Sequence, residues 1–304
     1  MRFADTSRNR PFAKDPAVVH FNDHYLMYYS VPPYKDDRTP NGWRIGIAKS
    51  TDLDHWTKIG ELQPEQECDK NGLCAPGALI HNNQVHLFYQ TYGNGPKDAI
   101  CHAVSNDGIT FTRNPTNPIF APTGDWTCGR AIDADVIPFQ NELWMYIATR
   151  DPDFKIQMLG VATAPLNSDF SRDTWTQRVD ASILKPELPW EQECIEAPSM
   201  IQRNGKLYMF YAGAYNNKPQ QIGLAISSDG INWTRYSDEP VLPCGHSDSW
   251  YASEAGHPYA FTDHDGTTHL FFQGNNDNGK TWYLSRAVVT WHGDNPIIKL
   301  HDQP

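Results

Sequence analysis

The sequence predicts an all-β fold, a five-bladed β-propeller with four antiparallel strands per blade, and three observations support this prediction. A pattern of strand, turn and aromatic strand occurs five times, beginning at positions 15, 75, 133, 197 and 257. These positions are 60, 58, 64 and 60 residues apart, and such a regular period is typical of repeat architectures. In addition, no stretch of 12 residues keeps the apolar i, i+3, i+4, i+7 spacing of an amphipathic helix.

Each repeat contains the elements of one blade. Its first two strands are joined by a short polar turn, in most repeats of residues that favour hairpins. These turns are Asn22-Asp23, Asn82-Asn83, Gln140-Asn141, Asn204-Gly205 and Asp265-Gly266. A third strand, a Ser-x-Asp-Gly turn and an edge strand follow in most repeats, and Trp56, Trp175 and Trp233 recur at the start of the edge strand. Because they recur, we expect these tryptophans to be structural.

We expect a single domain over residues 1–304. Its blades are predicted near residues 11–62, 74–121, 131–185, 195–243 and 254–300. The last blade of a propeller often pairs with the other end of the chain, and residues 1–10 and 295–300 are the candidates for this closure. Two β-sandwiches are the alternative architecture, but sandwiches do not repeat at this period.

The composition restricts the classes of partner. The chain has 25 Lys and Arg against 36 Asp and Glu, a net charge of −11, so nucleic acid is not an expected partner. No run of 18 apolar residues occurs, so no membrane span is expected either. Residues 1–14 lack the apolar segment of a signal peptide, which leaves a cytoplasmic location open, or a periplasmic or secreted one after removal of a leader. Many Trp and Tyr in an acidic chain suit a neutral polar ligand such as a sugar.

The first strands carry the candidate catalytic residues. In a propeller these strands line the central channel, so equivalent positions converge on one site. The residues at the repeat starts, with one immediate neighbour, are Asp15, Ala75, Asp133, Glu196, Ala197 and His257. Burying several carboxylates together is costly and drives their pKa values apart, as an acid/base pair requires. Alternatively, the carboxylates cap strands or bind an ion in the channel.

These residues resemble the pattern of glycoside hydrolase family 43 and its clan relatives, families 32, 62, 68 and 117. That pattern has Asp-Pro on blade one, an Ile-Asp-Pro-like segment on blade three and a Glu-Gly-Pro-like segment on blade four. Here residues 14–16 read Lys-Asp-Pro, residues 131–134 Ala-Ile-Asp-Ala, and residues 195–198 Ile-Glu-Ala-Pro. The resemblance covers essentially the whole chain. Blade one lacks the Asn-Asp-Pro-Asn-Gly signature of family 32, which argues against a fructosidase.

The resemblance implies an inverting glycosidase that cleaves terminal sugar units from plant or algal oligosaccharides and requires no cofactor. Asp15 would be the general base, Glu196 the general acid, and Asp133 the residue that orients the acid and tunes its pKa. Asp135 is an alternative to Asp133, because residues two apart in a strand face the same side. The sugars expected at the cleaved end are of the arabinose, xylose or galactose type.

Further residues are candidates for binding. His257 would contact substrate, as in a family 117-like anhydrogalactosidase, or ligate a structural calcium ion or water in the channel; a core histidine is the third option. Glu254 and Arg130 are candidates for substrate contact, with Arg8 and Arg10 as weaker ones. The candidate aromatic platforms are Trp43, Trp126, Trp190, Trp250, Tyr251 and Trp282.

Three other functions remain open at this point. A non-catalytic sugar-binding propeller would keep the aromatic platforms, and a protein-interaction propeller would not need converging carboxylates. A phosphorylase or transglycosylase would use the same fold, but the sequence shows no obvious Arg/Lys/His cluster for phosphate. The expected partner is an oligosaccharide substrate, and a homodimer stays open, since dimerisation completes the site in some relatives of the clan.

Overall fold

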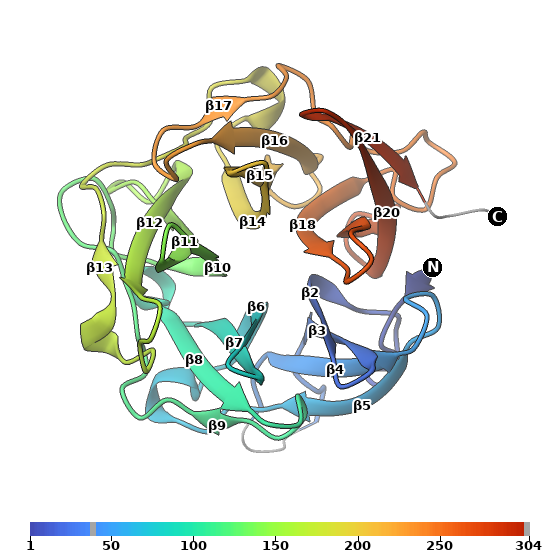
Figure 1. Ribbon diagram of the computed structural model, residues 1–304. Helices are drawn as coiled ribbons and strands as arrows, with labels where there is room; N and C mark the ends of the chain where they lie inside the picture. Colours follow the sequence, from blue (N-terminus) through green and yellow to red (C-terminus); the bar gives the residue numbers. More distant parts are fainter. Residues whose placement is uncertain (37–40, 301–304) are drawn as a thin grey trace.

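A computed structural model of the protein describes residues 1–36 and 41–300, which form five β-sheets arranged around a central axis (Figure 1). This arrangement confirms the predicted all-β, five-bladed propeller. The predicted domain also includes residues 37–40 and 301–304, which lie outside the described residues. Within the described ranges the only helices are short 3₁₀ turns: η1 (Glu67–Asp69), η2 (Gly95–Lys97), η3 (Arg172–Thr174) and η4 (Pro189–Glu191).

The strands follow one another outward from the axis in each antiparallel blade. Blade one consists of β2 (Lys14–Phe21), β3 (His24–Val31), β4 (Arg44–Ser50) and β5 (Thr57–Leu62). Blade two consists of β6 (Leu73–His81), β7 (Gln84–Thr91), β8 (Ile100–Ser105) and β9 (Thr112–Arg113). Blade three consists of β10 (Ile132–Phe139), β11 (Glu142–Arg150), β12 (Gln157–Pro165) and β13 (Thr176–Gln177). Blade four consists of β14 (Ile195–Arg203), β15 (Lys206–Gly213), β16 (Gln221–Ser227) and β17 (Thr234–Arg235).

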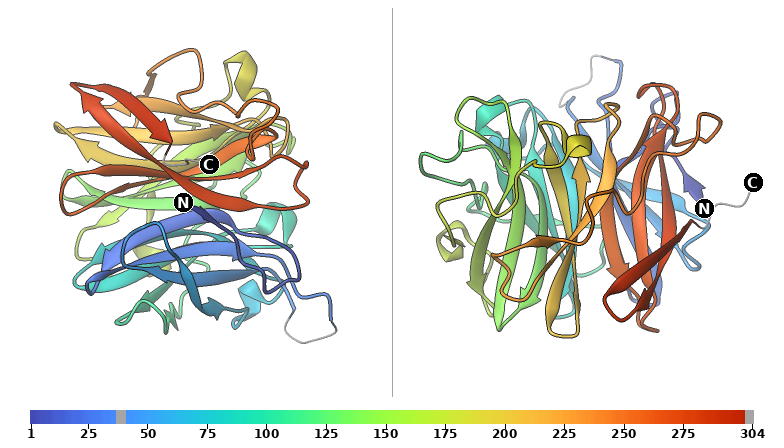
Figure 2. Two further views of the ribbon diagram at one scale, coloured as in Figure 1. Left: turned by 90° about the vertical axis from the view of Figure 1, so that its right-hand side faces the viewer. Right: turned by 90° about the horizontal axis from the view of Figure 1, so that it is seen from above.

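The two segments predicted to close the ring, residues 1–10 and 295–300, both contribute a strand to blade five. Its own strands are β18 (Glu254–Thr262), β19 (Thr268–Asn275) and β20 (Tyr283–His292). The outer edge of β20 pairs with β1 (Arg2–Phe3) from the N-terminal segment and with β21 (Asn295–Leu300). Figure 2 shows the two chain ends beside the blades that they join, blades one and five. The N-terminal segment therefore connects the last blade to the first.

Each first strand contains the same backbone irregularity. The pairing register shifts near the start of all five first strands, and one residue there has a positive φ. These residues are Asp15 (52°), Ala75 (47°), Asp133 (54°), Ala197 (51°) and His257 (43°). They are the residues at which the five repeats begin, so the repeat alignment marks a β-bulge that re-aims a side chain at the channel.

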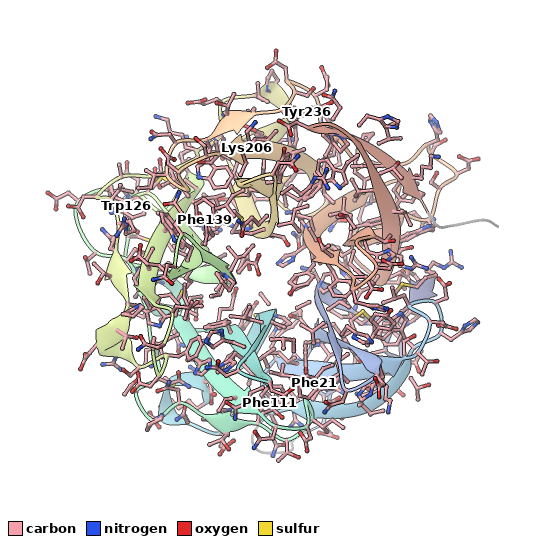
Figure 3. All side chains as sticks on the ribbon, viewed as in Figure 1. Phe21, Phe111, Trp126, Phe139, Lys206 and Tyr236 are labelled. Carbon is pink, nitrogen blue, oxygen red and sulfur yellow. The ribbon has the colours of Figure 1, made fainter. Side chains whose placement is uncertain are left out.

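Large side chains fill the space between the blades (Figure 3). Tyr28, Tyr89, Tyr146 and Phe271, all on second strands, are fully buried between neighbouring sheets. Trp56, Trp175 and Trp233 pack against three of the hydrophobic clusters, as expected of structural residues. In the described part of the chain, no helix is long and apolar enough to span a membrane.

Candidate active site

One mouth of the channel holds a cavity of about 340 Å³ between the starts of the first strands. Asp15, Asp133, Glu196 and His257 all line it. They come from blades one, three, four and five, so residues far apart in sequence meet in one pocket. This is the convergence that the repeat alignment predicts.

Side chains of the preceding blade hold the bulges in place. At four of the five bulges, a side-chain oxygen of the preceding blade accepts the N–H of the positive-φ residue. Ser30, Gln90 and Gln273 lie near the ends of second strands, and Gln220 directly precedes the third strand of blade four. The pairs are Asp15 N–H to Gln273 Oε1 (3.0 Å), Ala75 N–H to Ser30 Oγ (2.8 Å), Asp133 N–H to Gln90 Oε1 (3.1 Å) and His257 N–H to Gln220 Oε1 (3.1 Å). These bonds tie the bulges at Asp15, Asp133 and His257 to the preceding blades.

Asp15 is buried beside two cations. Its Oδ1 lies 3.9 Å from Lys14 Nζ and 3.5 Å from His257 Nε2. Burial alone would raise the pKa of Asp15, but the charges of Lys14 and His257 outweigh it and hold the pKa below its usual range. Asp15 is therefore an ionised carboxylate at neutral pH.

Glu196 is buried among amides. Gln220 Nε2 donates to its Oε1 at 2.6 Å, and Gln157 Nε2 donates to its Oε2. Burial and the negative charge of nearby Asp133 raise the pKa of Glu196. The pKa values of Asp15 and Glu196 thus shift in opposite directions within one pocket, so one can hold a proton when the other does not.

His257 lies between two carboxylates. Its Nε2 is 3.5 Å from Asp15 Oδ1 and 3.5 Å from Asp133 Oδ1. Burial lowers the pKa of His257, but the two carboxylates more than compensate and raise the pKa to about 9. The imidazole is therefore a cation at neutral pH.

A calcium ion in the channel does not suit these side chains. Calcium takes six to eight oxygen ligands, and a protonated imidazole repels a cation. Among the residues that the structure describes, no group of three or more His, Cys, Asp or Glu side chains is arranged to hold a metal ion. The channel calcium stays a prediction.

The side chain of Asp135 lies in a different part of the channel from that of Asp133, although only one residue stands between them in the sequence. Asp135 Oδ2 accepts the N–H of Met200 at 2.7 Å and lines a second cavity farther along the channel. The bulge at Asp133 breaks the two-residue alternation of the strand, so the two carboxylates do not share a pocket. Burial raises the pKa of Asp135 to about 7.

Some of the other predicted binding residues line the pocket and others do not. Arg130 and Trp43 line the pocket, and Trp43 packs against Tyr92, which lines it too, at 5.4 Å between ring centroids. Glu254 does not line it: the residue is fully buried and accepts hydrogen bonds from Gln273 Nε2 and the Asn217 N–H.

Two of the predicted aromatic platforms also lie outside the pocket. Trp126 is near the outer rim of blade three (Figure 3), where its indole N–H donates to the Thr123 carbonyl. Trp250 packs on Phe272, with 5.7 Å between ring centroids. Neither ring lines the cavity around Asp15 and Glu196.

Sequence reasoning missed several residues that line the pocket. They are Lys14, Gln90, Tyr92, Arg150, Gln157, Tyr215 and Asn216. Gln90 was detectable, because it occupies the same place near the end of a second strand as Gln273 and Ser30. Lys14 and Arg150 were not detectable, since they are far in sequence from each other and Arg150 is far from Arg130, which was predicted only as a single contact. From the sequence we expected no cluster of basic residues. The structure corrects this expectation, because it brings three basic side chains into one pocket.

The sequence profile described as glycosyl hydrolases family 43 matches residues 9–294. The chain belongs to this family. Family 43 membership places it in the glycosidase class of enzymes.

Solved structures similar to this family 43 chain show the same fold. A thermostable family-43 glycoside hydrolase has a TM-score of 0.76 at 21% identity, over 96% of this chain and 95% of the other. An endo-1,4-beta-xylanase from Bacteroides thetaiotaomicron VPI-5482 has a TM-score of 0.73 at 21% identity, over 98% and 97%. An alpha-L-arabinofuranosidase from Lactobacillus brevis has a TM-score of 0.71 at 18% identity, over 94% of each chain.

A curated relative of this family 43 chain has a different activity in its name. It is a beta-1,2-mannobiose phosphorylase from Thermoanaerobacter sp. (strain X514), 28% identical over 136 residues. The match spans 39% of this chain and 42% of the relative, less than half the length of either.

Proposed function

We propose that this family 43 chain hydrolyses glycosidic bonds with inversion of configuration at the anomeric carbon. Asp15 removes a proton from water, and the resulting hydroxyl adds to the anomeric carbon. The bond between the anomeric carbon and the leaving oxygen breaks on the opposite face of the sugar, and the Glu196 carboxyl donates its proton to that oxygen. The observation that carries this proposal is the pair of buried carboxyls whose pKa values shift in opposite directions in one pocket.

Asp133 and His257 support the pair without exchanging protons with substrate. The charge of Asp133 helps to keep Glu196 protonated. His257, with its pKa raised to about 9, is a cation that helps to keep Asp15 ionised and lies equally close to Asp133.

The proposed substrate is a short plant or algal oligosaccharide, cleaved at a terminal unit of the arabinose, xylose or galactose type. A cavity of about 340 Å³ is at the small end for ligand pockets, which favours a short oligosaccharide over a long bound chain. Trp43 and Tyr92 offer a stacking wall for a sugar ring. The names of the xylanase and arabinofuranosidase of similar fold agree with this class of sugar.

The test is turnover and product stereochemistry in matched variants. We expect Glu196→Gln and Asp15→Asn each to lower kcat by about 10²–10⁴-fold on aryl glycosides and oligosaccharides, because each removes one proton transfer. Substrate binding, measured by calorimetry, should persist. Glu193→Gln is the control, since Glu193 is exposed and pairs with Lys155 at 3.3 Å outside the pocket. NMR of the first product should show the inverted anomer, and a retained anomer contradicts the proposal.

Phosphorolysis is the second candidate function. Lys14, Arg130 and Arg150 line the pocket, and the curated relative is a phosphorylase. In this case phosphate would replace water as the nucleophile. The distinguishing measurement is the phosphate dependence of turnover: a hydrolase releases free sugar without phosphate, and a phosphorylase requires phosphate and yields a sugar phosphate. A non-catalytic sugar-binding propeller would show neither product.

A further inference from the structure

Two arginines of blade three converge on one amide oxygen in the pocket wall. Arg150 Nε donates to Gln157 Oε1 at 2.9 Å, and Arg130 NH1 donates to the same oxygen at 3.4 Å. Both guanidinium groups line the cavity, and we call Arg130 and Arg150 the arginine pair. Phe154 lies beneath both of them, with its ring centroid 4.4 Å from Arg150 Cζ and 5.9 Å from Arg130 Cζ.

The positive charge of the arginine pair is only partly balanced. Arg130 Nε lies 3.8 Å from Asp98 Oδ2. Arg150 has no carboxylate within 4.0 Å among residues 1–36 and 41–300; its other close neighbours are the Phe154 carbonyl and the Tyr215 ring. Like charges held together repel in a partly buried site, so the arrangement favours an anionic ligand. Such a site is notable in a chain with a net charge of −11.

The arginine pair lies on the side of the general acid. Gln157 accepts from both arginines and donates to Glu196 Oε2, so one amide connects them to the proposed acid. Asp15, the proposed base, is on β2, across the channel from β10 and β11 (Figure 1). In an inverting reaction the nucleophile and the leaving group occupy opposite faces of the sugar. A ligand group at the arginine pair therefore belongs to the leaving-group side.

We propose that the leaving-group sugar of the substrate carries a carboxylate, as a uronic acid does, and that the arginine pair binds it. The proposal rests on the assignment of Asp15 and Glu196 as base and acid. Planar guanidinium groups match a planar carboxylate with two parallel hydrogen bonds, and such charge-assisted bonds are stronger than neutral ones.

The test compares charged probes with uncharged probes of the same shape. Calorimetry on the wild-type protein would measure the affinities of D-galacturonate and D-glucuronate and of their methyl esters. We expect at least one acid to bind about tenfold more tightly than its ester. Arg150→Gln and Arg130→Gln should each reduce this ratio toward one. Arg178→Gln is the control, because Arg178 is exposed on the outer part of blade three and pairs with Glu142.

The ratio of acid to ester affinity distinguishes the loss of carboxylate binding from a general distortion of the pocket by the substitution. A distorted pocket would weaken the binding of acid and ester alike, so the ratio would not change. Equal affinities in the wild type, or no measurable binding of either acid, overturn the proposal. Tighter binding of galactose 6-sulfate than of both uronates also overturns it, in favour of a sulfated sugar. Inorganic phosphate that binds through Arg150 and is needed for turnover overturns it in favour of phosphorolysis. Hydrolysis of a neutral aryl glycoside, and its loss in Glu196→Gln, tests the catalytic assignment separately.

Discussion

Asp133 acts on Glu196 through its charge, because the two residues lie on neighbouring first strands of the same channel mouth. Burial is the larger cause of the raised Glu196 pKa, and the negative charge of Asp133 is the next. Glu196 is useful as an acid only while it keeps its proton. The upper pH limit of activity should therefore depend on Asp133, and the lower limit on Asp15, whose pKa is held low.

Asp133→Asn should move the alkaline limb of the kcat/KM profile about one pH unit lower. Removing the negative charge makes ionisation of Glu196 easier, so its pKa falls and the acid is lost at lower pH. The measurement is kcat/KM between pH 4 and 10 on one aryl glycoside. Asp135→Asn is the matched control, since Asp135 is two residues away on the same strand but outside the pocket. An alkaline limb that moves with Asp135→Asn and not with Asp133→Asn would reverse the assignment of the two aspartates.

The bulge in each first strand is a local device for aiming side chains, and it costs stability where the residue is not glycine. Ala75 has a φ of 47°, a left-handed conformation that a β-carbon disfavours. It persists because its N–H is held by Ser30 Oγ of the preceding blade at 2.8 Å. Blade two has no catalytic candidate at this position, so its strain can be relieved without removing a functional side chain.

Ala75→Gly should stabilise the protein by about 0.5–1 kcal/mol, since glycine tolerates a positive φ and the gain exceeds its greater loss of entropy on folding. Chemical denaturation monitored by tryptophan fluorescence measures this change. Ala78→Gly, on the same strand without a positive φ, should destabilise by about 0.5–1 kcal/mol or more. If both substitutions destabilise equally, the left-handed residue stores no strain.

The bulge also explains which parts of the site the sequence could predict. Hairpin turns at a regular period predicted the five blades, because turn chemistry is local and repeats. The convergence of Asp15, Asp133 and Glu196 followed from the same alignment. The place of Asp135 did not, since a one-residue bulge is invisible in a strand pattern. The arginine pair was equally hidden, because its residues meet only when β11 and the segment before β10 are folded side by side.

The whole ring depends on one junction, where the N-terminal segment bridges blades five and one. β1 pairs with β20 of blade five, with Phe3 opposite Leu284. The Phe3 ring meanwhile packs edge-on against Tyr29 of blade one, with 5.1 Å between ring centroids. The junction therefore sets the position of blade one, and with it Lys14 and Asp15, relative to Glu196 on blade four.

Phe3→Ala should lower the free energy of unfolding by about 1–2 kcal/mol, less than a fully buried phenylalanine would cost, because Phe3 is half-buried. Ile297→Ala is the matched control: Ile297 also lies on a strand paired with β20, but it stays within blade five and is 44% exposed. That substitution should change stability by no more than about 0.5 kcal/mol. Denaturant unfolding of the two variants shows whether β1 bridges blades five and one or only pairs with the edge of β20. Similar losses in both would mean that β1 only covers the edge of blade five and that other contacts hold the ring closed.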